Sequence, residues 1–263
     1  MTSFNEIWWQ ILILIIGAYL LGNLSIAFLL ARARKKDITK QGSGNPGTLN
    51  VYRNFGFLPG LITLLLDLFK GAVPTLVGWL IFKRYDFSPQ LDWGIIAMFL
   101  AGFFVVLGHD YPALRKFKGG KGVASTLGVY FVATSVLGFW YVGVAVFILG
   151  LLYIYFFEWG AIGSLIMMTI LPTFAIVYIA VKFQFSYWLL IVMILNGFLC
   201  ALSFFKHRGN LKKLANGTEN RTNLKNIFKK KKDKDKEQSK PVDAIEIKDA
   251  DNKNFENKKE QSK

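Results

Sequence analysis

Residues 122–157 read GVASTLGVYFVATSVLGFWYVGVAVFILGLLYIYFF, a run of 36 residues without a single charge. As one α-helix this run would be about 54 Å long, whereas the hydrocarbon core of a bilayer is roughly 30 Å thick. Two short membrane spans joined by a turn near Thr134–Gly138 match this thickness better. The division of this run decides how often the chain crosses the membrane, and therefore which polar loops share a side.

Five more apolar runs surround this stretch. They cover residues 7–31, 57–82, 93–107, 159–181 and 183–205. The chain of 263 residues is 53% hydrophobic, and a water-soluble domain of this size could not cover so much apolar surface. The sequence therefore predicts an all-α integral membrane protein, with seven transmembrane helices if the central run forms two.

Basic residues indicate the orientation, because cytoplasmic loops of membrane proteins carry an excess of lysine and arginine. One basic cluster follows the first apolar run, and another follows the last. Seven spans place both clusters on the same side, whereas six would separate them. We therefore expect the N-terminus outside and the C-terminus in the cytoplasm. The two clusters are Arg32, Arg34, Lys35 and Lys36, and Lys206, Arg208, Lys212 and Lys213.

Composition also bounds the cofactors and partners. With one cysteine and two histidines, the chain cannot form an intramolecular disulfide and has little with which to build a zinc or iron–sulfur site. We expect no metal and no other cofactor. Residues 1–221 are predicted to form the membrane domain, and residues 222–263 a disordered cytoplasmic tail of basic and mixed charge. Despite the net charge of +15, we expect no nucleic-acid partner for a protein with seven spans.

The first predicted inner segment, residues 42–56, reads GSGNPGTLNVYRNFG. Its glycines allow turns in which successive backbone N–H groups surround an anion. Hydroxyl, amide and guanidinium donors add hydrogen bonds that suit a phosphate. An ordinary turn at the membrane boundary is the alternative. The candidate binding residues are Gly42, Ser43, Gly44, Asn45, Asn50 and Arg53.

The second inner segment holds KGGKG at residues 118–122, directly before an apolar helix. Free N–H groups at a helix start attract anions, and the lysines add positive charge. The pattern is not a Walker A motif, because glycine rather than serine or threonine follows the second lysine. Anchoring of the loop at the inner membrane surface is the alternative role of the lysines. We interpret the nearby His109 as a core or interfacial histidine. The candidates are Lys118, Gly119, Gly120, Lys121 and Gly122.

Further polar side chains lie in or near the predicted spans. His207 and Asn210 follow the last apolar run, and Ser164 lies just inside the sixth span. His207 is a candidate proton donor, with a solvated histidine at the membrane boundary as the alternative. Asp67 and Lys70 lie three residues apart in the second span and can form an ion pair. Ionisable groups at membrane depth are functional candidates, and structural pairing is an equal alternative here.

Together these segments resemble the bacterial acyl-phosphate:glycerol-3-phosphate acyltransferases, the PlsY family. The resemblance covers residues 7–221 and follows the order of the spans. The chain departs from the family pattern at Pro46, where an aliphatic residue is usual, and at Glu158, where a basic residue is usual. The matching residues are Gly42, Ser43, Gly44, Asn45, Gly47, Asn50, Arg53 and Gly56; Gly108, His109, Pro112 and Phe117–Ala124; and His207, Arg208, Asn210, Gly217 and Glu219.

The resemblance implies a multi-pass plasma membrane enzyme with its active site facing the cytoplasm. Such an enzyme transfers a fatty acyl group from acyl phosphate to the 1-hydroxyl of glycerol 3-phosphate. The products are 1-acylglycerol 3-phosphate (lysophosphatidic acid) and phosphate, in the first step of phospholipid synthesis. Beyond these substrates and the bilayer no partner is implied, and a monomer is compatible with the pattern. The implied catalytic residues are Ser43, Lys121, His207 and Asn210, with Arg53, Ser164 and the glycine-rich segments binding substrate.

Two other functions compete with this interpretation. A transporter of organic phosphates would need polar residues along a path across the bilayer, whereas the polar residues here gather on one predicted side. An acyl-CoA-dependent acyltransferase of the soluble-domain class would carry a His-x-x-x-x-Asp pair. Neither His109 nor His207 is followed by an aspartate at that spacing.

Overall fold

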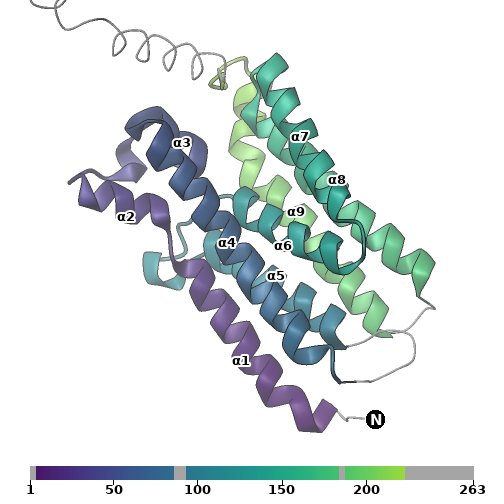
Figure 1. The fold of residues 1–263 in the computed structure, drawn as a ribbon. Helices are drawn as coiled ribbons and strands as arrows, with labels where there is room; N and C mark the ends of the chain where they lie inside the picture. The colour runs from purple at the N-terminus through teal and green to yellow at the C-terminus, as the bar shows by residue number, and fades with distance from the viewer. Residues whose placement is uncertain (1–3, 86–92, 184–186, 223–263) are drawn as a thin grey trace, which may run out of the picture. The chain divides into compact units, whose positions relative to one another are not determined.

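The computed structural model describes residues 4–85, 93–183 and 187–222, and every regular element within these ranges is helical (Figure 1). Two short 3-10 turns, η1 (Ile38–Lys40) and η2 (Ala113–Arg115), lie in the loops. The α-helices are α1 (Phe4–Asn23), α2 (Ile26–Ala33), α3 (Thr48–Phe55), α4 (Phe57–Phe82), α5 (Trp93–Asp110), α6 (Val123–Val136), α7 (Trp140–Phe157), α8 (Gly160–Lys182) and α9 (Tyr187–Ala215).

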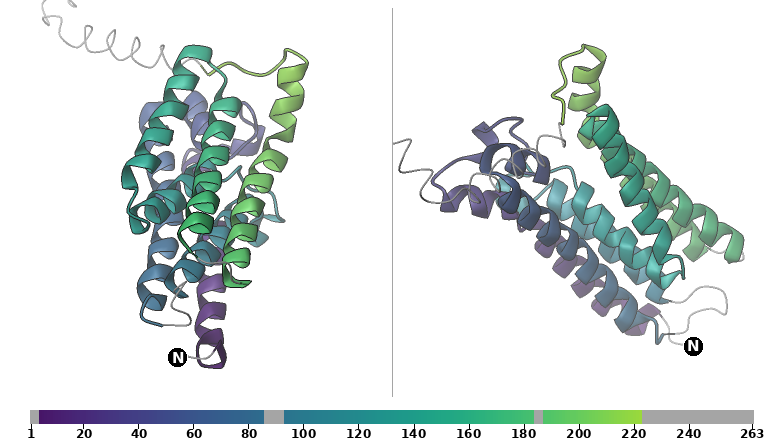
Figure 2. Two further views of the ribbon diagram at one scale, coloured as in Figure 1. Left: turned by 90° about the vertical axis from the view of Figure 1, so that its right-hand side faces the viewer. Right: turned by 45° about the horizontal axis from the view of Figure 1, so that its top comes forward.

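Helix α5 is the centre of the bundle. Helices α1 and α4 pack along it, α6 packs against α4 and α5, and α9 contacts it from the side of α7 and α8 (Figure 2). In the apolar stretch of α5, 78% of the residues are buried, against 22% to 44% in the other candidate spans. A helix enclosed in this way can be apolar all round, which explains why α5 has no polar face.

Helices α4 and α6 approach so closely that their backbones touch. A Cβ atom added at Gly71 of α4 would lie 2.0 Å from the carbonyl oxygen of Ser125, and one at Gly128 of α6 would lie 2.0 Å from that of Leu68. Small residues allow this approach. In lipid the hydrophobic effect does not drive helices together, so close van der Waals packing of this kind stabilises their association. The contact fixes the start of α6 against the middle of α4.

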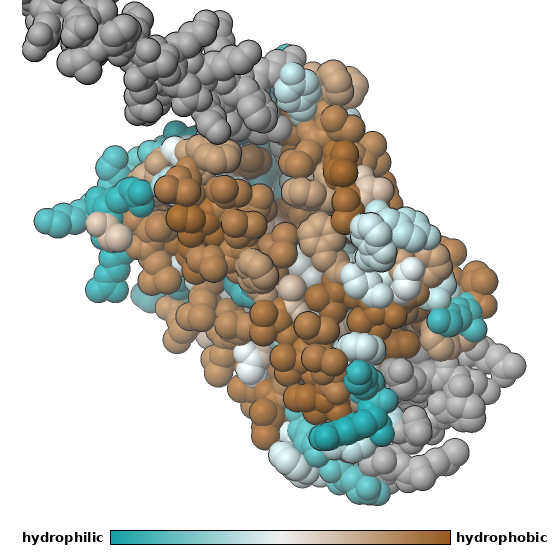
Figure 3. Space-filling model, viewed as in Figure 1, coloured by the Kyte–Doolittle hydropathy of each residue, from teal (hydrophilic) through white to brown (hydrophobic). Residues whose placement is uncertain are grey.

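The predicted all-helical membrane class is confirmed. Among the described residues, six segments are long and apolar enough to cross a bilayer, and apolar residues cover much of the face shown in Figure 3. The predicted division of residues 122–157 is also confirmed, because α6 ends at Val136 and α7 begins at Trp140. Helix α6 has 14 residues and rises only about 21 Å, so it is shorter than a standard span.

Two predicted boundaries are wrong. The first run, 7–31, is not one helix, because the helix is interrupted between Asn23 and Ile26. The last helix does not end at Phe205 but continues to Ala215, because loss of hydrophobicity marks the edge of the apolar core and not the end of a helix. Hydropathy alone cannot locate either feature.

The predicted tail lies outside the described residues, apart from Thr222. That residue belongs to the body of the protein, since it is 3% exposed and its N–H donates to the carbonyl of Glu158 over 2.7 Å. Thr222 therefore packs with the described helices, whereas the predicted boundary after residue 221 and the predicted disorder of the tail stay predictions.

Gly71→Ala should destabilise the protein, because the added methyl group collides with backbone that cannot move independently. We expect a loss of about 1–3 kcal/mol or more, seen as a lower thermal unfolding midpoint in detergent. Gly17→Ala is the matched control, since nothing lies within 4 Å of a Cβ atom at this exposed position in α1. Equal midpoints for the two variants would contradict the close packing of α4 and α6.

Candidate functional site

The loop before α3 is shaped by Asn50. This side chain is 2% exposed, and its Oδ1 accepts the N–H of Ser43 over 3.0 Å while its Nδ2 donates to the carbonyl of Gln41 over 2.9 Å. Gly42 and Gly44 take positive φ angles of 54° and 70°, which favour glycine. Asn50 therefore holds the loop from inside, whereas the exposed Ser43 is available on its surface.

The remaining candidates of this loop differ in exposure. Asn45 is half-buried, and its backbone N–H lies 3.4 Å from the hydroxyl oxygen of Ser43. Its side-chain nitrogen would lie 2.7 Å from a Cβ atom at Gly47, so the amide folds back over the loop. Pro46 is buried beside it. Ser43 and Asn45 are thus the neutral polar groups that the loop presents at its surface.

The second glycine-rich segment lies against the end of α5. The N–H of Gly120 donates to the carbonyl of His109 over 3.1 Å, and a Cβ atom at Gly119 would lie 2.1 Å from the same oxygen. Gly122 takes a φ of 67° immediately before α6. Only glycine fits these positions. Packing against α5 therefore explains the glycines of this segment even without a bound ligand.

The two lysines of this segment differ in exposure and in hydrogen bonding. Lys118 is exposed, whereas the half-buried Lys121 donates to Oδ1 of Asn210 on α9. Asn210 in turn donates from Nδ2 to the carboxylate of Glu219 over 2.6 Å. The continuation of α9 past its apolar part makes this contact possible. The structure thus brings together two predicted catalytic residues, Lys121 and Asn210, and adds Glu219.

His207 lies one turn before Asn210 on the same helix. It is 2% exposed, and its Nδ1 lies 2.8 Å from the carbonyl oxygen of Ser203. If Nδ1 carries the proton, this bond leaves Nε2 as an acceptor. The alternative of a solvated histidine is wrong, because the side chain is buried.

Arg53 is held by the chain that follows α9. Its Nη2 donates to the hydroxyl of Thr222 over 2.6 Å and to the carbonyl of Arg221 over 3.4 Å. Arg221 also lies 3.7 Å from Glu158, which joins this segment to the turn between α7 and α8. Partial burial lowers the pKa of Arg53, and the Glu219 carboxylate opposes that shift. Sequence analysis missed these partners of Arg53.

Ser164 is buried in the first part of α8, where its hydroxyl donates to the carbonyl of Gly160 over 2.8 Å. A Cβ atom at Gly160 would meet Thr222 and Leu49, so the start of α8 lies against the first turn of α3 and the segment after α9. The structure thus places Ser164 one turn from this junction, and its hydroxyl is engaged within its own helix.

The contact between the buried Asp110 and the half-buried Lys206 was also missed. Lys206 of α9 donates to the backbone carbonyl of Asp110 over 2.8 Å, and its ammonium lies 4.3 Å from the centre of the Tyr111 ring. Asp110 is 1% exposed. Within residues 4–85, 93–183 and 187–222, no three His, Cys, Asp or Glu side chains gather as a metal site would require.

Comparison with known proteins identifies the family to which this fold belongs. A family described as "Glycerol-3-phosphate acyltransferase" matches residues 12–217. The chain belongs to the glycerol-3-phosphate acyltransferase family. It is 35% identical over 214 residues to such an enzyme from Pseudothermotoga lettingae, covering 81% of this chain and 95% of the relative. It is 39% identical over 209 residues to one from Geotalea daltonii, covering 80% and 96%.

Solved structures of the family share the fold. The crystal structure of PlsY (YgiH), an integral membrane glycerol 3-phosphate acyltransferase, in its glycerol 3-phosphate form matches with a TM-score of 0.70 and 29% identity. The match covers 83% of this chain and 98% of that one. A second structure, the lysophosphatidic acid form, gives a TM-score of 0.68. The predicted resemblance to the PlsY family is confirmed, and the chain is an acyltransferase.

Lys121 should give the enzyme an alkaline limit. Burial lowers the pKa of Lys121 to about 8, although the Glu219 carboxylate opposes this shift. Because the ammonium loses its proton above that pH, kcat/KM should fall as the pH rises through about 8. Lys121→Arg keeps its charge, so its kcat/KM should fall only at higher pH, whatever its maximal rate.

The matched control is Lys116→Arg, which changes an exposed lysine in the same loop. It should leave the pH profile of kcat/KM where it is in the unmodified enzyme. If kcat/KM of Lys121→Arg falls at the same alkaline pH as in the unmodified enzyme, a group other than Lys121 titrates there.

Proposed function

We propose that this chain transfers a fatty acyl group from acyl phosphate to the 1-hydroxyl of glycerol 3-phosphate, releasing lysophosphatidic acid and phosphate. Membership of the family supports the acceptor and the reaction class. The observation that carries the proposal is the contact between Lys121 and Asn210, which joins the KGGKG loop to α9. It brings a cation and an amide together beside the glycine backbone of the loop.

The reaction needs no cofactor, because acyl phosphate is already activated. The 1-hydroxyl oxygen attacks the acyl carbonyl carbon, and the bond from that carbon to the phosphate oxygen breaks. An oxygen of a substrate phosphate takes the hydroxyl proton, which leaves with inorganic phosphate. Lys121 and the glycine N–H groups stabilise the charge that develops on the carbonyl oxygen and on the leaving phosphate.

The first loop supplies the second substrate site. Ser43 and Arg53 hold glycerol 3-phosphate so that its hydroxyl faces the acyl carbonyl. His207 and Asn210 organise the groups around it, and Ser164 contributes from α8. Arg53 donates to residues 221–222 through Nη2, and its other guanidinium N–H groups can donate to a phosphate.

We also propose the orientation. With α6 counted as a short span, seven spans put the basic clusters at the end of α2 and after the apolar part of α9 on the cytoplasmic side. The loops that carry the site then face the cytoplasm, where a phosphorylated, water-soluble acceptor is available. We propose the plasma membrane as the location of the enzyme.

A donor exchange tests the reaction. Purified protein in lipid cubic phase, given glycerol 3-phosphate, should form lysophosphatidic acid and release phosphate with palmitoyl phosphate. It should form no product with palmitoyl-CoA. Product with palmitoyl-CoA would overturn the proposed donor, and no product with either donor from folded protein would favour the transporter.

Arg53→Lys should raise the KM for glycerol 3-phosphate about tenfold, because a point charge replaces a planar fork with two parallel donors. The matched control is Thr222→Val, which keeps the shape of the side chain but removes the hydroxyl that Arg53 binds. If Arg53 only anchors the segment after α9, both variants should lower the unfolding midpoint alike and neither should change KM. A raised KM in Arg53→Lys alone assigns Arg53 to the substrate.

A further inference from the structure

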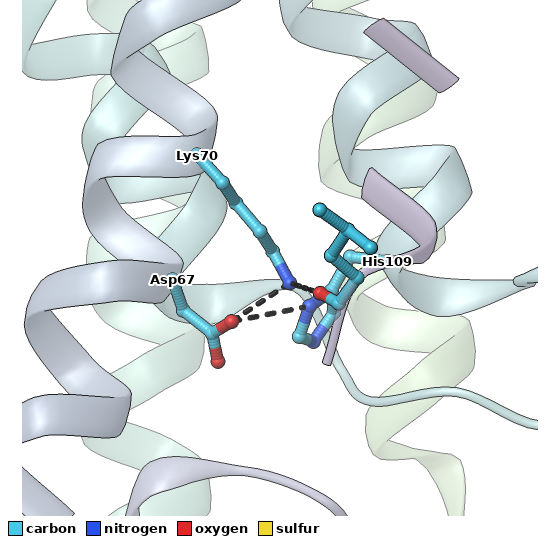
Figure 4. Close-up of polar contacts among 4 residues, drawn as sticks. Asp67, Lys70 and His109 are labelled. Atoms are coloured by element: carbon cyan, nitrogen blue, oxygen red, sulfur yellow. Dashed lines mark hydrogen bonds and ion pairs between the residues drawn. The ribbon is translucent and has the colours of Figure 1, made fainter. Parts of the chain in front are cut away.

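Asp67, Lys70 and His109 form a buried cluster that the proposed mechanism does not use (Figure 4). Their exposed fractions are 3%, 7% and 7%. Asp67 and Lys70 come from α4, and His109 comes from the end of α5. Removing charges from water costs free energy that an ion pair only partly recovers, so this cluster is weak evidence for stability alone. Its neighbours indicate what else it does.

Lys70 connects α4 to the break between α1 and α2. Its Nζ lies 2.7 Å from Oδ1 of Asp67 and donates to the carbonyl of Leu24 over 2.7 Å. That carbonyl lies just after the end of α1. Carbonyl oxygens at the end of a helix have no N–H group of the same helix to accept a hydrogen bond from. Since an unpaired carbonyl is costly in an apolar bundle, Lys70 makes the break possible.

His109 connects the same pair to the KGGKG loop. Its Nδ1 lies 3.9 Å from Oδ1 of Asp67 and forms no hydrogen bond with any described residue. The opposite edge of the ring faces the loop, since a Cβ atom at Gly120 would lie 2.1 Å from Nε2. The carbonyl of His109 accepts the N–H of Gly120. Residue 109 therefore touches the loop with both its ring and its backbone.

We propose that Asp67, Lys70 and His109 are positioning residues for the acyl donor: they fix the place of the Gly119–Gly120 backbone, whose remaining N–H group, that of Gly119, binds the phosphoryl group of acyl phosphate. The inference rests on the proposed function of that loop. Asp67 orients the imidazole ring, and Lys70 fixes Asp67 by bonding both its carboxylate and the carbonyl of Leu24. None of the three touches substrate.

The test separates the two substrates. In Asp67→Asn and in His109→Gln, the KM for palmitoyl phosphate, as a mole fraction of lipid, should rise about tenfold, because a small displacement of binding groups is costly. The KM for glycerol 3-phosphate should stay near its original value. Lys70→Arg can still bond both partners and should keep the original KM for palmitoyl phosphate.

A matched control and a double variant complete the design. Thr75→Val removes a buried hydroxyl of α4 that donates to the carbonyl of Gly71 in the same helix, and it should leave both KM values unchanged. The double variant Asp67→Asn with His109→Gln should raise the donor KM no more than the single variants do, because residues acting as one unit are not additive. If Asp67→Asn does not fold, His109→Gln leaves the ion pair intact and carries the test.

Each outcome supports or overturns the inference. Unchanged KM values, with only a lower unfolding midpoint, would mean that the cluster is structural and would overturn it. A raised KM for glycerol 3-phosphate instead would assign the cluster to the acceptor and overturn it as well. Failure of the proposed function would appear separately, as an unmodified enzyme that makes no product from palmitoyl phosphate.

Discussion

The backbone contact between α4 and α6 governs the arrangement of the site. Because Gly71 and Gly128 have no side chains, the two helices touch, and the start of α6 is fixed beside Asp67 and Lys70. The KGGKG loop, which leads into α6, must then pass over the end of α5, where only glycine fits against His109. Lys121 emerges from this loop toward α9. A larger residue at either glycine would displace the loop and the lysine together.

The polar part of the site is built from segments that are far apart in the chain. Arg53 bonds residues 168 and 169 positions away, and Lys121 bonds a residue 89 positions away. The segment after α9 joins these two cations, since the Glu219 carboxylate opposes the lowering of both pKa values by burial, while Thr222 and Arg221 accept hydrogen bonds from Arg53. When substrate is absent, hydrogen bonds and the Glu219 carboxylate thus stabilise Arg53 and Lys121. Without these partners the two partly buried cations would repel each other.

Much of the fold could be predicted because membrane insertion depends on local composition. The α4 boundaries at Phe57 and Phe82 and the turn between α6 and α7 follow from runs of apolar residues. The break after Asn23 could not be predicted, since the lysine that stabilises it is 46 residues away from Leu24. Among the site residues, Lys121 and Asn210 meet as the motifs indicated. Asn50 proved to hold its own loop, and the hydroxyl of Ser164 is bonded within α8.

The sequence by itself determined the helical membrane class, the family and the loops that carry polar chemistry, because hydrophobicity and short motifs are local properties. The tertiary structure alone decided which charged groups meet. The placement of Asp67 and Lys70 against Leu24 and His109, and of Arg53 against the end of the described chain, depends on helix packing. The sequence pattern of two ionisable residues in a span is the same whether they bind substrate or position a loop. Only their neighbours in space distinguish these roles.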